Sequence, residues 1–169
     1  KSIGVGNLVM GGTGKSVVVM YLIKTLKDFR IASLSRGYGR KTKGLVIAGP
    51  KDNPTILGDE PYQFFNRYPE TVVAVSEKRA IGVKALAKMP NLIDFIILDD
   101  VMQHRWVRPQ MMIMTSSFQR PYFKDFVFPA GDLREFRSGV KRADILLVTR
   151  TPEEFSVEHK EVFVKNIKI

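Results

Sequence analysis

The sequence lacks cysteine altogether, and its 169 residues include only two histidines. Without cysteine the chain cannot build a disulfide scaffold, a thiolate zinc site, an iron–sulfur cluster or a cysteine nucleophile. The two histidines are far apart in sequence, so a histidine-based metal cluster is not expected. Long apolar runs are missing too, because the longest one, Val17–Ile23, falls well short of the roughly 18 residues of a membrane span.

Positive charge is what the chain has in excess. It carries 27 Lys and Arg against 17 Asp and Glu, which gives a formal net charge of +10. Hydrophobic residues make up 44% and charged residues 26%, values that exclude wholesale disorder and are typical of a folded domain. The excess indicates an anionic partner: a nucleic acid, a phosphorylated ligand or an acidic membrane surface. Composition does not choose among these three.

Short β-rich apolar runs alternate with segments of helical periodicity, within a length that suits one domain. The expected strands are 2–5, 30–35, 46–48, 71–75, 95–98, 111–114 and 144–148. The expected helices are 15–27, 59–67, 78–88 and 152–165, the last with Phe155, Val162 and Phe163 on its apolar face. Continuous apolar strands favour a parallel sheet that is covered on both faces. In such an α/β fold, ligands gather at the carboxyl ends of the strands.

The strongest motif is the segment Gly11–Ser16, which reads Gly-Gly-Thr-Gly-Lys-Ser between a short strand and a helix. Its glycines allow backbone N–H groups to surround phosphate oxygens. Lys15 would reach the β- and γ-phosphates of a nucleotide, and the Ser16 hydroxyl would ligate Mg²⁺. The strict pattern has one more glycine, where this chain has Val9. The segment predicts a variant phosphate loop with Gly11, Gly12, Thr13, Gly14, Lys15 and Ser16 as nucleotide-binding residues, the alternative being a glycine-rich turn.

A second motif is the apolar strand 95–98, which ends at Asp99 and Asp100. A carboxylate there would be held beside the phosphate loop, where it can bind Mg²⁺ or a metal-bound water. Acids that follow strands are also common as helix caps and turn residues. The upstream phosphate loop favours the metal interpretation, with Ser16 and Asp99 as ligands. Together the two motifs predict a P-loop NTPase, a three-layer α/β sandwich with a mainly parallel sheet.

Further charged residues are expected at the same edge of the sheet. The basic loop 36–43 follows the second strand, and its arginines would bind a substrate phosphate or an RNA backbone unless they are only solvated. Arg134 stands beside a glycine turn. A lone histidine such as His104 is more often a loop or packing residue than a catalyst. Asp59 is explained equally well as an acid at a helix N-terminus.

Taken together, six segments in one order resemble the tetraacyldisaccharide 4′-kinase family of lipid A biosynthesis. They are Val5–Ser16, Leu34–Arg40, Gly58–Pro61, Leu98–Arg105, Pro129–Glu135 and Arg142–Asp144. Each segment alone is weak evidence for the family, but the ordered set is specific to it and covers most of the chain. The segment Arg36–Gly44, with its Lys-Thr-Lys, resembles the Bacteroidetes branch of the family.

The resemblance implies transfer of the ATP γ-phosphoryl group to the 4′-hydroxyl of a tetraacyldisaccharide 1-phosphate, with Mg²⁺, at the cytoplasmic face of the inner membrane. It implies a peripheral membrane protein with no nucleic-acid partner. The catalytic residues that it implies are Lys15, Asp59, Asp99 and Asp100, with Asp59 orienting or deprotonating the attacking hydroxyl. The substrate-binding residues that it implies are Arg36, Arg40, His104 and Arg134.

The chain departs from the family pattern at Val101-Met102, which replace Gly-Phe, at 115–117, where an acid is usual, and at Phe136, which replaces proline. Family members are also longer, with an N-terminal membrane-associated segment and a C-terminal domain that bears a histidine. We therefore expect residues 1–169 to be the nucleotide-binding core of the kinase without those regions, able to bind nucleotide but inactive alone.

Three alternatives stay open at this point. The first is another phosphate-loop NTPase, such as a switch GTPase or a metallochaperone, although the sequence has no Asn-Lys-x-Asp motif for reading guanine. The second is a degenerate, non-catalytic relative, since the departures follow Asp100 directly. The third, from a different class, is a basic nucleic-acid-binding module, which the charge supports but no recognisable motif does.

Overall fold

A computed structural model of the chain describes residues 1–90, 92–154 and 156–167, without the side chains of His159 and Val162. The strands are β1 (Ser2–Gly6), β2 (Ile31–Ser35), β3 (Val46–Ile47), β4 (Val72–Val75), β5 (Phe95–Asp99), β6 (Met111–Ser117) and β7 (Ile145–Thr149). The helices are α1 (Lys15–Thr25), α2 (Pro54–Leu57), α3 (Asp59–Arg67), α4 (Arg79–Ala87) and α5 (Val157–Asn166), with 3₁₀ turns at Tyr122–Lys124 and Arg137–Arg142.

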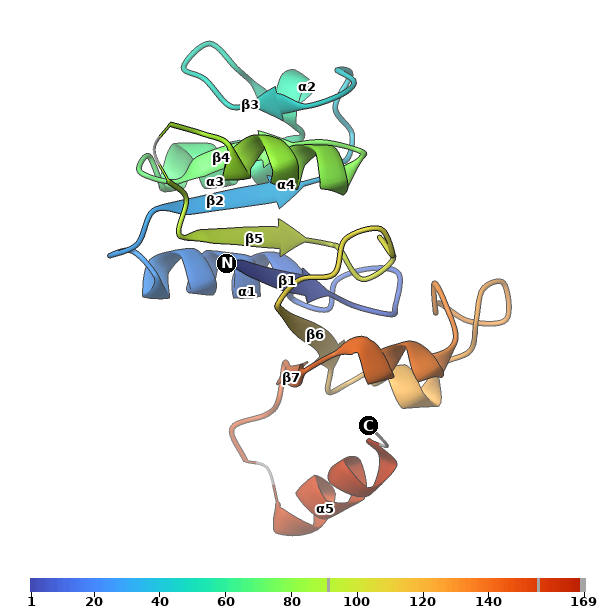
Figure 1. Cartoon of the computed structure of the whole chain (residues 1–169). Helices are drawn as coiled ribbons and strands as arrows, with labels where there is room; N and C mark the ends of the chain where they lie inside the picture. The colour runs from blue at the N-terminus through green and yellow to red at the C-terminus, as the bar shows by residue number, and fades with distance from the viewer. Residues whose placement is uncertain (91, 155, 168–169) are drawn as a thin grey trace.

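The strands form one sheet in the order β3-β4-β2-β5-β1-β6-β7. All neighbouring strands are parallel except β3, which runs antiparallel to β4. In Figure 1 the arrowheads of β1, β2 and β5 accordingly point the same way. The loops that follow the parallel strands therefore meet at one edge. At that edge the loop after β1 lies between the end of β5 on one side and the ends of β6 and β7 on the other.

Side chains alternate between the two faces of the sheet, and each face has its own apolar core. On one face, Val5 and Ile97 pack against Val19 of α1 and Phe64 of α3. On the other, the core includes Leu34, Leu98 and Met114 from the strands, Leu86 from α4, and Tyr122 and Leu133 from the segment before β7. Figure 1 shows α4 on the face opposite α1 and α3. The predicted three-layer α/β sandwich is confirmed.

The predicted strands and the helices before β7 are confirmed to within a few residues, with two informative differences. β6 continues beyond Met114 to Ser117 because the hydroxyls of its last residues are buried against β7 and the loops. The short helix α2 is not among the predicted helices, because the pair Asn-Pro is typical of turns and loops. Here Asn53 caps the helix by accepting hydrogen bonds from the backbone N–H groups of Thr55 and Ile56, and Pro54 takes the first helical position.

The last predicted helix, 152–165, begins five residues later than expected, as α5. Of its expected apolar residues, Phe155 and the side chain of Val162 lie outside the described residues. Phe163 stacks on Phe118, with the ring centroids 5.6 Å apart. In the described part of the chain, no helix combines the length and the apolar character that crossing a membrane requires.

Gly82 of α4 provides a test of how tightly this helix packs on the sheet. A Cβ atom at this position would lie 2.7 Å from both δ-carbons of Leu34, which is fully buried. Alanine favours a helix by about 1 kcal/mol over glycine. Overpacking a core costs more than that, so Gly82→Ala should lower the free energy of unfolding in urea by about 1–2 kcal/mol net.

The matched background is Leu34→Ala, which removes the side chain that the new methyl group would meet. In that background Gly82→Ala should be neutral or stabilising, since only the helix propensity remains. An equal loss in both backgrounds would show that the contact with Leu34 is not what requires glycine.

Candidate nucleotide-binding site

The predicted phosphate loop joins the end of β1 to the start of α1. Gly11 has φ 98° and Gly14 has φ 83°, a left-handed backbone that favours glycine. Gly14 is the N-cap of α1 and provides no side-chain cap, and the first turn of the helix carries no acid. The backbone N–H groups of that turn are therefore available to an anion.

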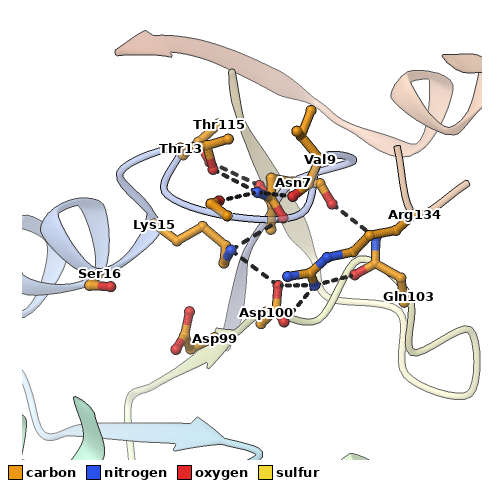
Figure 2. Close-up of polar contacts among 12 residues, drawn as sticks. Asn7, Val9, Thr13, Lys15, Ser16, Asp99, Asp100, Gln103, Thr115 and Arg134 are labelled. Atoms are coloured by element: carbon orange, nitrogen blue, oxygen red, sulfur yellow. Dashed lines mark hydrogen bonds and ion pairs between the residues drawn. The ribbon is translucent and has the colours of Figure 1, made fainter. Parts of the chain in front are cut away.

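The buried side chain of Asn7 holds this loop together. Its Nδ2 donates to the backbone oxygen of Val9 at 2.7 Å and to the Thr13 hydroxyl at 2.7 Å. Its Oδ1 accepts from Lys15 Nζ at 3.2 Å. Thr13 is in turn 2.8 Å from the hydroxyl of Thr115 on β6 (Figure 2). One amide thus connects the start, the middle and the end of the loop, and ties it to the sheet.

Val9, which replaces a glycine of the strict motif, is accommodated without strain. Its side chain is 5% exposed and belongs to the apolar core on the α4 face. Its backbone forms an isolated bridge with Leu133, next to the hydrogen bond that the Arg134 N–H donates to the oxygen of Leu8 at 2.7 Å. The loop here packs on the segment before β7, so a buried side chain fits where other phosphate loops have glycine.

Lys15 and Arg134 share one carboxylate, that of Asp100. Lys15 Nζ lies 3.4 Å from Asp100 Oδ1, and Arg134 Nη1 donates to the two carboxylate oxygens at 2.8 and 3.0 Å. Burial opposes the charge on Asp100, but the two cations outweigh it and hold its pKa below the usual value. Figure 2 shows both cations directed at this group beneath the loop. The predicted catalytic residues Lys15 and Asp100 are therefore in contact.

Asp99, the last residue of β5, is buried with an unpartnered oxygen. It is 4% exposed, and its Oδ1 has no hydrogen-bond partner among the described residues. Burial raises its pKa to about 7, and the neighbouring charges of Glu60 and Asp100 add to the effect. Such an atom favours a cation, because an isolated buried carboxylate is costly.

Ser16, in the first turn of α1, belongs to the same part of the site. Its hydroxyl is hydrogen-bonded to a carboxylate oxygen of Glu60, in the first turn of α3. Asp59, next to Glu60, is exposed and begins α3 after Gly58, whose φ is 91°. The Gly58–Pro61 segment is therefore brought to the phosphate loop.

Buried Arg79 is a site residue that sequence analysis missed. It is 1% exposed and donates to the backbone oxygens of Ser76 and Asp99, the latter at 3.3 Å. Burial lowers its pKa to about 10, although the negative charges of Asp99 and Asp100 act to raise it. Read from the sequence, it was one more cation at the start of a helix. Nothing local distinguished it from a solvated arginine.

The candidate substrate-binding residues divide into two groups. His104 is half-buried, and burial together with the charges of Arg79 and Arg36 lowers its pKa, so Arg36 and His104 share one electrostatic environment. Arg40 is engaged within the protein: its Nη2 donates to Glu77 at 2.6 Å and to the oxygen of Gly44 at 2.7 Å. Arg134 is engaged with Asp100, as described above.

Comparison with known proteins identifies the family. A family model described as tetraacyldisaccharide-1-P 4′-kinase matches residues 2–168. The chain belongs to this family. It is 45% identical over 155 residues to the tetraacyldisaccharide 4′-kinase of Flavobacterium psychrophilum, covering 91% of this chain and 45% of that protein. It is 39% identical over 168 residues to that of Bacteroides thetaiotaomicron, covering 98% and 44%.

A solved structure agrees with this assignment. The crystal structure of the "apo" form of LpxK from Aquifex aeolicus in complex with ATP superimposes with a TM-score of 0.79 and 39% identity, covering 92% of this chain and 51% of that one. The chain spans about half the length of the relatives that it matches. The family resemblance and the P-loop α/β fold are both confirmed.

The network around Asn7 leads to a stability prediction. Asn7→Ala removes hydrogen bonds to Val9, Thr13 and Lys15 from a fully buried site, so the free energy of unfolding should fall by about 2 kcal/mol or more. Urea denaturation measures the change. Asn66→Ala, at an exposed position on α3, is the control and should change stability by no more than about 0.5 kcal/mol. Similar values for the two variants would contradict the assigned role of Asn7.

Proposed function

We propose that residues 1–169 form the nucleotide-binding core of a kinase that transfers the ATP γ-phosphoryl group to the 4′-hydroxyl of a tetraacyldisaccharide 1-phosphate. The observation that carries the proposal is the position of Lys15. Its ammonium group lies between Asn7 and Asp100 at an uncapped helix N-terminus, where phosphates bind. The family assignment supplies the reaction, and the ATP complex of the Aquifex relative supports the choice of nucleotide.

Binding of a nucleotide would exchange the partners of Lys15. Its charge is matched by Asp100, which also accepts two hydrogen bonds from Arg134. When Lys15 turns to the phosphates, Arg134 still neutralises Asp100. The carboxylate, whose side chain is 35% exposed, is therefore not left without a cationic partner. The transfer itself demands positioning and charge stabilisation more than covalent catalysis.

The residues present fit Mg²⁺, and we assign Ser16 and Asp99 as its ligands. In nucleotide sites Mg²⁺ takes one or two carboxylates together with substrate phosphates and waters. The unpartnered, buried oxygen of Asp99 and the nearby hydroxyl of Ser16 match this set of donors. Once bound, the ion would supply positive charge to the phosphoryl oxygens.

For the acceptor, we propose that Asp59 orients or deprotonates the attacking hydroxyl, and that Arg36, Arg40, His104 and Arg134 bind substrate. A cavity of about 610 Å³ opens beside His104. Its rim is basic and its floor is apolar; the lining residues include Arg105, Arg108, Lys141 and Arg142 on the rim and Val101, Met102, Pro109 and Met112 on the floor. An anion that also carries apolar chains complements such a surface.

The same region supports peripheral attachment at the cytoplasmic face of the inner membrane. Trp106 is 94% exposed and stands between Arg105 and the nearby Arg108. Indole rings beside cations are typical of membrane–water interfaces. With a net charge of +10, an anionic leaflet would attract the protein, each Lys or Arg at the surface contributing about 1 kcal/mol.

The nucleotide proposal predicts the effect of Lys15→Ala. The dissociation constant for ATP with Mg²⁺, measured by calorimetry, should rise at least about 100-fold, because charged hydrogen bonds to phosphate are lost. Lys24→Ala is the matched control, since Lys24 is exposed near the end of the same helix and should leave affinity unchanged. Normal ATP affinity in Lys15→Ala would contradict the phosphate-loop assignment. Tighter binding of GTP than of ATP would favour a GTPase instead.

The acceptor proposal predicts a different result for Asp59→Ala in the intact protein. Loss of the group that orients the hydroxyl should lower kcat about 100-fold or more while ATP affinity stays the same. Turnover of the disaccharide 1-phosphate with Mg²⁺-ATP measures the first quantity and calorimetry the second. Asp28→Ala, at an exposed position beyond α1, should change neither. An unchanged kcat would remove Asp59 from the mechanism, and no conversion by the unaltered protein would overturn the kinase activity.

A further inference from the structure

Arg150, at the carboxyl end of β7, has a position that the proposed chemistry leaves unexplained. It is one of two non-glycine residues with positive φ among those described, at 56°, the other being Asp100 in the site itself. A Cβ atom on Gly12 of the phosphate loop would lie 3.3 Å from Arg150 Nη2. The guanidinium group therefore lies against the outer part of the loop, although Gly12 and Arg150 are 138 positions apart in sequence.

The neighbouring residue holds Arg150 in this place. The Thr149 hydroxyl donates to the backbone oxygen of Thr13 at 3.0 Å, and the oxygen of Thr149 accepts the N–H of Phe118 at 2.8 Å. The methyl group of Thr149 would lie 3.2 Å from a Cβ atom on Gly14. The end of β7 and the phosphate loop are thus packed together, so Arg150 has a defined position relative to any nucleotide bound there.

The Arg150 side chain is exposed and has no protein partner within residues 1–90, 92–154 and 156–167. It differs in this from Arg134 and Arg142, whose guanidinium groups are matched by Asp100 and Glu135. A planar cation that no carboxylate neutralises, held over a glycine, is free to contact a ligand.

The order of the strands decides which part of a nucleotide would reach Arg150. Lys15, Asp99 and Asp100 gather where β5 borders β1, so the terminal phosphates would lie on the β5 side of the loop. β7 is on the opposite side, beyond β6. A nucleotide whose terminal phosphates are held beside β5 extends away from it, toward the ends of β6 and β7. Arg150 would then meet the nucleoside and not the terminal phosphate.

We propose that Arg150 stacks its guanidinium plane on the purine base of the bound nucleotide, with Thr149 as the residue that positions it. Guanidinium groups stack on aromatic faces through cation–π and dispersion contacts, and such a contact needs no hydrogen-bond partner on the base. This inference rests on the proposed nucleotide-binding function and adds the base subsite to it.

The test compares ATP with inorganic tripolyphosphate, which has the phosphates but no base. Binding to the unaltered chain, Arg150→Ala and Arg30→Ala is measured by calorimetry with Mg²⁺. Arg30 is the control, since it is an exposed arginine just before β2, at the amino edge of the sheet, where it forms a surface ion pair with Asp94. Arg150→Ala should weaken ATP binding about tenfold and change tripolyphosphate binding by less than about twofold. Arg30→Ala should change neither, and the thermal midpoints should agree.

Each possible result of these measurements either supports or overturns the proposed stacking. An equal loss for ATP and tripolyphosphate would place Arg150 on a phosphate and overturn the stacking, as would an unchanged ATP affinity. A second readout is the fluorescence of etheno-ATP: stacking should alter it in the unaltered chain, and Arg150→Ala should abolish that change. If the unaltered chain binds neither ATP nor tripolyphosphate, the nucleotide-binding function itself fails, and this inference fails with it.

Discussion

The side-chain amide of Asn7 is the contact on which the geometry of the site depends. It is fully buried at the end of β1, it donates within the phosphate loop to Val9 and Thr13, and it accepts from Lys15. Through Thr13 the same network reaches Thr115 on β6. A glycine-rich loop has high conformational freedom when unfolded, so a loop that must hold its N–H groups in one arrangement needs such an internal brace.

Around this brace, the two adjacent carboxylates Asp99 and Asp100 differ in their partners. Asp100 is saturated by Lys15 and Arg134, whereas Asp99, one residue earlier, keeps an unpartnered oxygen and a raised pKa. Adjacent residues on one chain point into different environments because β5 ends between them and Asp100 turns into a left-handed backbone. Asp100 is thus matched by cations of the protein itself, whereas the oxygen of Asp99 is left for the Mg²⁺ that we propose.

Much of the fold follows from local patterns. Continuous apolar runs predict the parallel strands, and the Gly-Lys-Ser and Asp-Asp motifs predict which strand ends meet. The errors have local causes as well. Asn53-Pro54 reads as a breaker, yet the same two residues are a good N-cap and first helical position. β6 was expected to end at Met114 because Thr115–Ser117 are polar, but buried hydroxyls with hydrogen-bond partners cost little in a strand.

The linear pattern alone is enough for the fold class, the family and the phosphate loop, because glycine spacing and strand periodicity are local properties. It cannot show that the side chain of Asn7 holds the glycine-rich loop in place. Nor can it show that Val9 is accommodated because its side chain enters the core. It cannot show that Arg40 is held by Glu77, while Arg150 has no partner among the residues that the structure describes. These facts depend on which segments the sheet brings together across more than thirty residues of sequence, as Thr13 and Thr149 show. Hydrogen bonds and ion pairs act through space, so only the tertiary structure decides them.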